Sequence, residues 1–332
     1  MMKKSVDSLR LSCGTRQHFE RVLVACAGRI LGVLAFGSVE PQCSNRQFPF
    51  LWVQQSVLGG ETWFEVWVST QRVTVSPVGS LVCAQDDGFI FGGLVLAEDG
   101  RDNLEFLAHQ GYSAIFDKMD REGYPYLLRV WNYFPGINDT GRELERYREF
   151  NVGRHEAFSH KIDRAFEGGV PAACALGTED GGLVLGFLAS RVPGISLENP
   201  RQTRAYDYPE NFGPKSPVFS RGMLVGNALF ISGTASILGS ETVYPGDMAR
   251  QVDEMLINLR AVIKQAATYG FDAYGAEGGC FNVYLRYAED YPMVRDKLSA
   301  EFPAADCRVY LQADICRADL LVEVEAFWIE GI

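Results

Sequence analysis

A long amphipathic helix near the carboxyl end, with strands on both sides, is the feature that most constrains this chain. Over residues 245–270 the apolar side chains fall on one helical face, Asp247 is placed as an N-cap, and Gly270 ends the pattern. Strand patterns at 218–225 and 227–235 precede this helix, and strand patterns at 280–288, 307–315 and 320–329 follow it. A second helix is expected at 292–302. The resulting order, strand-strand-helix-strand-helix-strand-strand, predicts a mixed sheet with two helices on one face.

The residues before this unit predict a second region that is rich in strands. Strands are expected at Val22–Ala27 and Ile30–Phe36 around a Gly28-Arg29 turn, and between 48 and 99, with Gly59-Gly60 as a hairpin turn. Helices are expected over 103–118 and 141–168, with further strands at Tyr126–Trp131 and within 171–190. The aromatic cluster Trp131–Phe134 is expected in the core.

A proline-rich segment, residues 192–217, separates the two regions. It is predicted to be extended and rich in turns, and it is either a linker or a binding loop. Tyr206, Tyr208, Phe212 and Lys215 favour a binding loop, because linkers seldom carry such side chains together. The chain of 332 residues is long enough for about two domains. We therefore divide it into 1–205 and 206–332.

Charge and composition exclude several classes of function. Lys and Arg number 31 and Asp and Glu 42, a net charge of −11, which argues against binding to nucleic acid or to an anionic membrane. The eight cysteines and four histidines show no metal-ligand spacing and no disulfide framework, so no metal is expected. Phosphate-binding and nucleophile-elbow glycine motifs are absent. No signal peptide or membrane span is recognised, so we expect a cytoplasmic protein with free thiols.

The carboxy-terminal region resembles the RidA (YjgF-type) family. The resemblance rests on ISGTAS at 231–236, Asp247 with Gln251 and Asn258, the strand 281–285, and 307–326. It implies an α+β fold of the RidA/YjgF-like (chorismate-mutase-like) type. It also implies that Arg308 holds a substrate carboxylate and that Glu323, fifteen residues later, lies at the same cleft.

Four motifs across both regions resemble the chorismatase family, whose members have two domains and a RidA-like carboxy-terminal half. They are RVWNYFPGIN (129–138), ERYREFNVGRHEAF (145–158), YPENFGPKSPVFSR (208–221) and DICRADLLVEVE (314–325). The resemblance implies removal of the enolpyruvyl group of chorismate as pyruvate, without metal or organic cofactor. The partner is then a small molecule, and not nucleic acid or a membrane.

The chemistry of such a substrate suits the residues in these motifs. Chorismate is a dianion, and the planar fork of arginine binds carboxylates. Glu323 is the expected acid, which must be held protonated by burial to donate its proton near neutral pH. The expected substrate-binding residues are Arg148, Arg154, Tyr208, Lys215, Arg221, Thr234, Ala235, Arg286 and Arg308.

The product is implied only by the resemblance, and its two markers differ. Cys316, seven residues before Glu323, goes with the branch that forms 3-hydroxybenzoate, in some members with 4-hydroxybenzoate. Ala235 stands where alanine goes with the branch that admits water and releases a dihydroxycyclohexadiene carboxylate. We favour hydroxybenzoate, with catalytic residues Glu323 and Cys316. The open alternatives are the diene, a RidA-like imine or enamine deaminase, and a non-catalytic sensor of a small acid.

Two expectations concern individual residues and assembly. Glu325 alternates with valines on the same strand as Glu323, and we interpret it as part of a solvated strand face. Thr234 either donates a hydrogen bond to substrate or satisfies a turn. RidA proteins are trimers, but an additional amino-terminal half can fill their interface within one chain. We therefore expect a monomer, with a trimer as the alternative.

Overall fold

The structure is a computed structural model that describes residues 7–42, 47–98, 103–161, 169–271, 279–305 and 307–329. Three sheets and a short strand pair make up the β-structure of these residues. The α+β class predicted from the sequence is confirmed. No helix in the described ranges is long and apolar enough to cross a membrane.

The first sheet belongs to the amino-terminal part of the chain. Its strand order is β1-β4-β2-β3, in which β2 and β3 are parallel and the other pairs antiparallel. Helix α2 (Arg16–Ala25) packs on it. The strands are β1 (Leu9–Thr15), β2 (Ile30–Gly37), β3 (Phe50–Gln54) and β4 (Trp63–Ser69).

The strand predicted at Val22–Ala27 is wrong, because most of that segment lies in helix α2. Phe19, Val22 and Cys26 have helical spacing and are buried in one cluster against β2 and β4, whereas Val24 is 82% exposed. The apolar run that suggests a buried strand thus belongs to a helix, which buries one face and leaves Val24 exposed. The neighbouring prediction, a strand at Ile30–Phe36, is confirmed by β2.

The hairpin predicted at Gly59-Gly60 is also wrong, because β2 lies between β3 and β4. The connecting segment pairs instead with the third sheet. The Leu58 amide donates to the Tyr310 carbonyl, the Gln312 amide donates to the Ser56 carbonyl, and Val57 bridges Leu311. Residues 56–58 therefore cover an edge strand that lies about 250 positions away in the sequence.

The second sheet has the order β5-β6-β7-β10-β8-β9, with α3 (Leu104–Glu122) and α4 (Arg146–Ser159) against it. The helix expected at 103–118 is confirmed by α3, which begins after the N-cap Asn103. The helix expected at 141–168 is confirmed over 146–159, while 162–168 lies outside the described residues. The strands are β5 (Thr74–Val78), β6 (Leu81–Gln85), β7 (Phe89–Leu96), β8 (Tyr126–Pro135), β9 (Ala172–Thr178) and β10 (Leu183–Ser190).

The third sheet has the order β11-β12-β13-β18-β16-β17 and confirms the element order predicted for the carboxy-terminal region. Asp247 is the N-cap of α6 (Met248–Ala267), since its side chain accepts from the Arg250 amide, and α7 (Tyr291–Glu301) follows β16. The strands are β11 (Ile195–Leu197), β12 (Gly222–Val225), β13 (Ala228–Ala235), β16 (Cys280–Leu285), β17 (Cys307–Gln312) and β18 (Val322–Trp328). A small pair, β14 (Ile237–Leu238) and β15 (Glu241–Thr242), and three 3-10 turns, η1 (Ala205–Asp207), η2 (Glu210–Phe212) and η3 (Ala288–Asp290), complete the structure.

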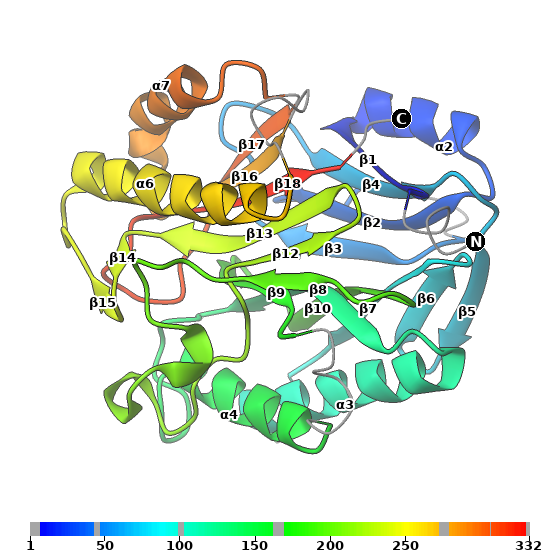
Figure 1. Ribbon diagram of the computed structural model, residues 1–332, viewed down its shortest axis with the longest axis horizontal. Helices are drawn as coiled ribbons and strands as arrows, with labels where there is room; N and C mark the ends of the chain where they lie inside the picture. The colour runs from blue at the N-terminus through cyan, green and yellow to red at the C-terminus, as the bar shows by residue number, and fades with distance from the viewer. Residues whose placement is uncertain are drawn as a thin grey trace.

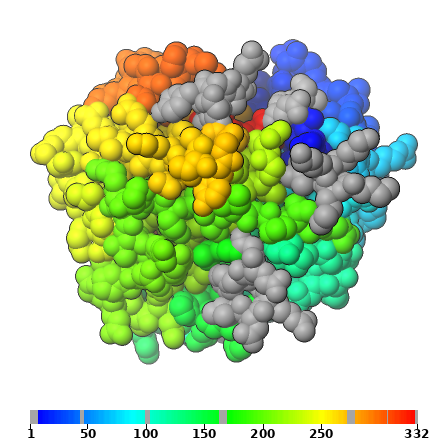
Figure 2. Space-filling model, in the orientation of Figure 1, coloured from blue at the N-terminus to red at the C-terminus, as the bar shows by residue number. Residues whose placement is uncertain are grey.

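The layers are arranged so that the second and third sheets lie between helices. Figure 1 shows α6 and α7 above the third sheet and α3 and α4 below the second. The segment 192–217 contains β11, which pairs with β12 in the third sheet, and then η1 and η2. In the space-filling view the green surface of residues around 200 directly adjoins the yellow surface of α6 (Figure 2).

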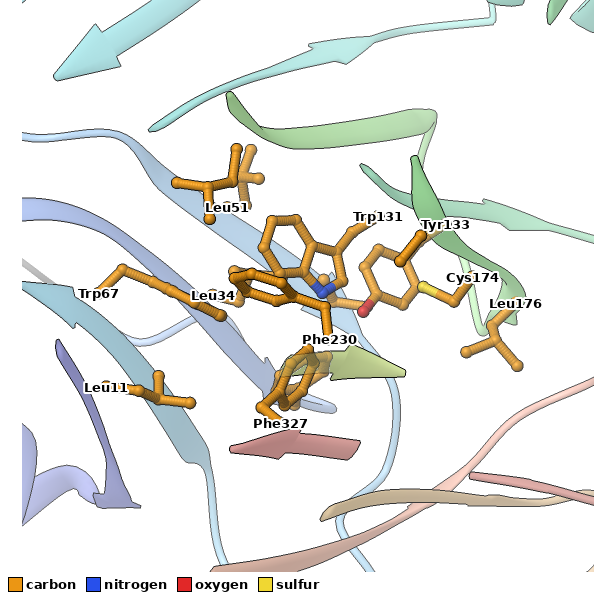
Figure 3. Close-up of a cluster of buried hydrophobic side chains, with 14 of the residues drawn as sticks. Leu11, Leu34, Leu51, Trp67, Trp131, Tyr133, Cys174, Leu176, Phe230 and Phe327 are labelled. Atoms are coloured by element: carbon orange, nitrogen blue, oxygen red, sulfur yellow. The ribbon is translucent and has the colours of Figure 1, made fainter. Parts of the chain in front are cut away.

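One apolar core joins all three sheets. Trp67 from the first sheet lies with its ring centroid 5.2 Å from Trp131 of the second, 5.7 Å from Phe327 and 6.2 Å from Phe230 of the third. These aromatic side chains converge in Figure 3, where Leu11, Leu51 and Leu176 also contribute. The prediction that the aromatic cluster around Trp131 belongs to the core is confirmed.

Candidate active site

A cavity of about 370 Å³ opens between the second and third sheets. Strands β13 and β18 form its base, the start of α4 and the η1–η2 segment form one wall, and the loop after β17 forms another. The predicted site residues that line it are Arg148, Tyr208, Arg221, Ala235, Cys316 and Glu323.

Glu323 is the carboxylate of this cavity. It lies on β18 opposite Ala235 of β13 and is only 4% exposed. Burial, reinforced by the charge of Glu325, raises the pKa of Glu323 to about 8, against the lowering effect of Arg129 and Arg221. The side chain is therefore protonated at neutral pH. The Glu323 carboxyl group has no hydrogen-bond partner among the described residues, so the carboxyl proton is available to a ligand.

The backbone next to Glu323 is shaped to admit its side chain. The β13–β18 register shifts between Ile231 and Thr234, so Gly233 lies in the irregular stretch. A Cβ at Gly233 would collide with the Glu323 carboxyl group. A side chain at 233 would therefore displace the Glu323 carboxyl group from this position, and Gly233 is a site residue that the sequence analysis missed.

Glu325 is not on a solvated face, so that expectation is wrong. It is fully buried and forms an ion pair with Arg129, which is also fully buried. Tyr284 donates a hydrogen bond to its other carboxylate oxygen. The guanidinium of Arg129 lies 5.4 Å from the ring centroids of both Trp131 and Phe327. The apparent solvated face is covered by the second sheet.

Two buried arginines face the cavity region without a carboxylate partner among the described residues. Arg221 is 4% exposed and uses one nitrogen on the Thr203 carbonyl and the Tyr208 hydroxyl. Arg154 is 1% exposed, donates to Asn151, and lines a hollow of about 30 Å³ that also reaches Glu323. The Nε of each lacks a hydrogen-bond partner. A buried cation without an ion-pair partner is costly, so the two arginines favour an anionic ligand.

The mouth of the cavity carries two more arginines and aromatic rings. Arg148 forms an ion pair with Glu145 at 3.3 Å. Arg317 lies over the rings of Phe212, 4.3 Å from the centroid, and Tyr208, 5.3 Å away. One of its nitrogens donates to the Ser240 carbonyl. Arg317 was not among the predicted residues, although its position beside Cys316 in the fourth motif could have suggested it.

Cys316 lies beside Glu323 in the cavity wall. Burial, together with the Glu323 charge, raises the pKa of Cys316 to about 12, so the group is a neutral thiol at physiological pH. It packs against the apolar core that joins the three sheets and against the cluster between the second sheet and its helices. A neutral thiol there shapes the cavity and offers only a weak hydrogen bond.

Four of the predicted substrate-binding residues line neither the cavity nor the hollow beside it. The Arg286 guanidinium donates to Asn138, Asp314 and three backbone carbonyls of the loop 315–320. Arg308, on β17, donates to the Phe302 carbonyl. Lys215 is exposed, and the buried Thr234 hydroxyl donates to the Ser232 carbonyl. Thr234 thus satisfies its own bulge, one of the two predicted outcomes.

A second cavity, of about 620 Å³, lies beside helix α2 in the amino-terminal part. Its described lining is formed by apolar residues, glycine and Gln47, without an ionisable side chain. The smaller cavity, which joins a neutral acid to several arginines, is therefore the candidate active site.

This arrangement can bind a small carboxylic acid and deliver a proton to it. Comparison with known proteins identifies the family. A sequence profile described as chorismatase FkbO/Hyg5-like, N-terminal, matches residues 65–189. A 3-hydroxybenzoate synthase of Streptomyces hygroscopicus is 35% identical over 335 residues, which span 94% of this chain and 96% of that protein. A chorismatase of the same organism is 36% identical and covers 80% of this chain and 79% of its own length. The chain belongs to the chorismatase family.

A solved structure supports the same assignment. The crystal structure of a chorismatase superposes with a TM-score of 0.84 at 30% identity, covering 97% of this chain and 98% of that chain. The similarity therefore extends over both the strand-rich amino-terminal part and the carboxy-terminal sheet. The family resemblance inferred from the four motifs is confirmed.

Proposed function

We propose that this protein cleaves chorismate to pyruvate and 3-hydroxybenzoate. The observation that carries the proposal is a protonated, buried Glu323 in the same cavity region as Arg154 and Arg221, two buried cations without a carboxylate partner in the described structure. A neutral acid beside unmatched positive charge suits a dianion that is to be protonated. A 3-hydroxybenzoate synthase is among the relatives that cover almost the whole chain.

The arginines would hold the two carboxylates of chorismate. Arg221 and Arg154 lie deep, so they suit the carboxylate that must be fixed near Glu323. Arg148 and Arg317 lie at the mouth and suit the other carboxylate. The rings of Tyr208 and Phe212 beneath Arg317 would keep its guanidinium in the orientation for binding.

Glu323 would act as general acid. It donates its proton to the methylene carbon of the enolpyruvyl group and leaves an oxocarbenium ion. In the hydroxybenzoate branch the ring hydroxyl attacks the neighbouring ring carbon that carries the ether oxygen. That ring C–O bond breaks, pyruvate leaves with the ether oxygen as its keto oxygen, and the hydroxyl proton replaces the one that Glu323 gave. The arene oxide that remains opens and rearomatises. Chorismate then divides into pyruvate and 3-hydroxybenzoate without water, an oxidant or a reductant. A carboxylate of the bound substrate beside Glu323 would raise the pKa of Glu323 further.

The branch would be set by the residues beside Glu323. Cys316 and Ala235 flank it, and the neutral Cys316 thiol occupies space that water could otherwise fill. We favour 3-hydroxybenzoate because of Cys316, while Ala235 is the reason to examine the diene.

Arg286 would be a positioning residue. Its hydrogen bonds to five acceptors hold the loop that carries Cys316 and Arg317.

We also propose that the protein works as a monomer, because residues of one chain line the cavity from both sheets. Cysteines without a disulfide in the described part suit a reducing cytoplasm.

The test is to mix purified protein with chorismate and to measure pyruvate by coupled reduction and the aromatic products by chromatography. We expect equal amounts of pyruvate and 3-hydroxybenzoate. The diene in place of hydroxybenzoate would overturn the branch but keep the acid step. Absence of pyruvate above the spontaneous background, with ammonia released from 2-aminoacrylate, would replace the proposal by a deaminase. Light scattering measures the assembly.

A further inference from the structure

Three cysteines that are far apart in the sequence meet at the seam between the first and third sheets. Cys13 lies in β1, Cys280 begins β16 and Cys307 begins β17. Their Sγ atoms all lie within 4.8 Å of one another, and those of Cys13 and Cys280 are 3.8 Å apart. Cys280 and Cys307 are register partners in the parallel β16–β17 pair, so two of the thiols are fixed side by side by the sheet.

The 3.8 Å between the Sγ atoms of Cys13 and Cys280 fits two ligands of one metal ion better than a disulfide, and the Cys307 sulfur lies within 4.8 Å of both. With metal–sulfur bonds of about 2.3 Å, tetrahedral geometry places two sulfurs ~3.8 Å apart and trigonal geometry ~4.0 Å. A disulfide needs about 2.05 Å between sulfurs, and it would leave the third thiol unpaired. All three cysteines are partly exposed as residues.

The ligand set determines the kind of ion. Three thiolates are soft ligands, which select thiophilic cations over Mg²⁺ or Ca²⁺. A fourth Cys, His, Asp or Glu does not join the group in the described part of the chain. Cu⁺ accepts three ligands, and Zn²⁺ would complete its shell with water.

We propose that Cys13, Cys280 and Cys307 form a binding site for a thiophilic d¹⁰ cation, Zn²⁺ or Cu⁺. The site is structural and separate from the catalytic cavity, since the three residues do not line it. A bound ion ties β1 of the amino-terminal sheet to β16 and β17 of the carboxy-terminal sheet. The spacing of the cysteines in the sequence gave no sign of this site, because each comes from a different strand.

The test uses the full-length, reduced protein in two arms, one titrated with Zn²⁺ and one with Cu⁺ under argon. We expect one equivalent to bind in at least one arm, with a sulfur shell at about 2.3 Å in X-ray absorption. The metal should protect three thiols from a thiol reagent and raise Tm, and a chelator should reverse both effects. The arm with the tighter binding identifies the ion.

Variants show whether these cysteines are the ligands. Cys13→Ala, Cys280→Ala and Cys307→Ala should each weaken binding at least about 100-fold. Cys→Ser substitutions repeat the test where an alanine variant does not fold. Cys83→Ala, in β6 of the second sheet, is the matched control and should bind as wild type. Absence of stoichiometric binding in both arms, or wild-type affinity in all three variants, would overturn the site. Chorismate turnover is not needed for any of these measurements.

Discussion

Two carboxylates on one strand, Glu323 and Glu325, occupy opposite kinds of surroundings. Both are buried, both point from β18 toward the second sheet, and only Val324 separates them. Glu325 meets the cation Arg129 and the hydroxyl of Tyr284. Glu323 meets a cavity. The difference lies in what the second sheet places opposite each of them.

The comparison shows how a fold keeps one acid neutral beside an ionised one. Arg129 is committed to Glu325, so the positive charge that could ionise Glu323 is largely neutralised. The charge of Glu325 also raises the pKa of Glu323. The core ion pair therefore contributes to the chemistry of the cavity, as well as connecting the second sheet to the third.

Substitution of the cavity acid should have the largest effect. Glu323→Gln removes the proton donor but keeps the shape, so kcat should fall about 10²–10⁴-fold. Pyruvate release under saturating chorismate measures this fall in kcat.

The Tm of Glu323→Gln at pH 9 should be no lower than that of wild type. Wild type loses stability as pH rises from about 4.3, the unfolded pKa, to about 8, whereas the amide does not titrate. A rate within threefold of wild type would refute the acid role.

Substitution of the core cation should act on stability instead. Arg129→Met leaves Glu325 charged, buried and unpaired, so the free energy of unfolding should fall by about 3–5 kcal/mol. Denaturant unfolding measures this loss. The double variant Arg129→Met/Glu325→Leu, which removes both charges, should recover most of it. A loss below ~1 kcal/mol in the single variant would mean that the pair is not closed in the core.

The same substitution at a cavity arginine should give the reverse pattern. Arg221→Met removes a buried cation that has no carboxylate partner in the described structure, so the fold should lose little or gain. The substrate should lose a charged hydrogen bond of about 1.5–3 kcal/mol, a rise in KM of roughly 10–150-fold. Steady-state kinetics and thermal melting of Arg129→Met and Arg221→Met, side by side, check the contrast. Equal KM values for Arg221→Met and wild type would contradict it.

The pH dependence of the rate should connect the two carboxylates. Because Glu323 acts protonated, kcat/KM should fall as pH rises through about 8. Glu325→Gln removes a charge that raises the pKa of Glu323, so this limb should move to lower pH by about 0.5–1 unit. The profile is measured at low temperature, where the destabilised variant stays folded. A limb that does not move would show that the two groups are not coupled.

The carboxy-terminal sheet could be predicted because its signals are local. The apolar face of α6, its Asp247 cap and the alternating strands are each contained in one segment. Glu323 and Arg221 were found through motifs that resemble the family, and both line the cavity.

The remainder could not be predicted because it depends on contacts between distant segments. Arg129 and Glu325 are 196 residues apart, so an alternating strand gave no sign of the cation that covers Glu325. Packing against other strands decides which face of α2 is buried, and it places β2 between β3 and β4. Such packing overrides the local sequence pattern. Arg286 has the burial expected of a ligand-binding arginine, yet its acceptors come from the protein itself.

The pairing of residues 56–58 with β17 has a consequence for the halves of this molecule when they are separated. An open β-strand edge recruits other chains, and β17 is the outermost strand of its sheet. The amino-terminal segment occupies backbone groups of Tyr310 and Gln312 on that edge. A fragment that began at residue 206 would expose this edge and the aromatic rings around Phe327. It would therefore be expected to aggregate, whereas in the intact chain residues 56–58 cover this edge.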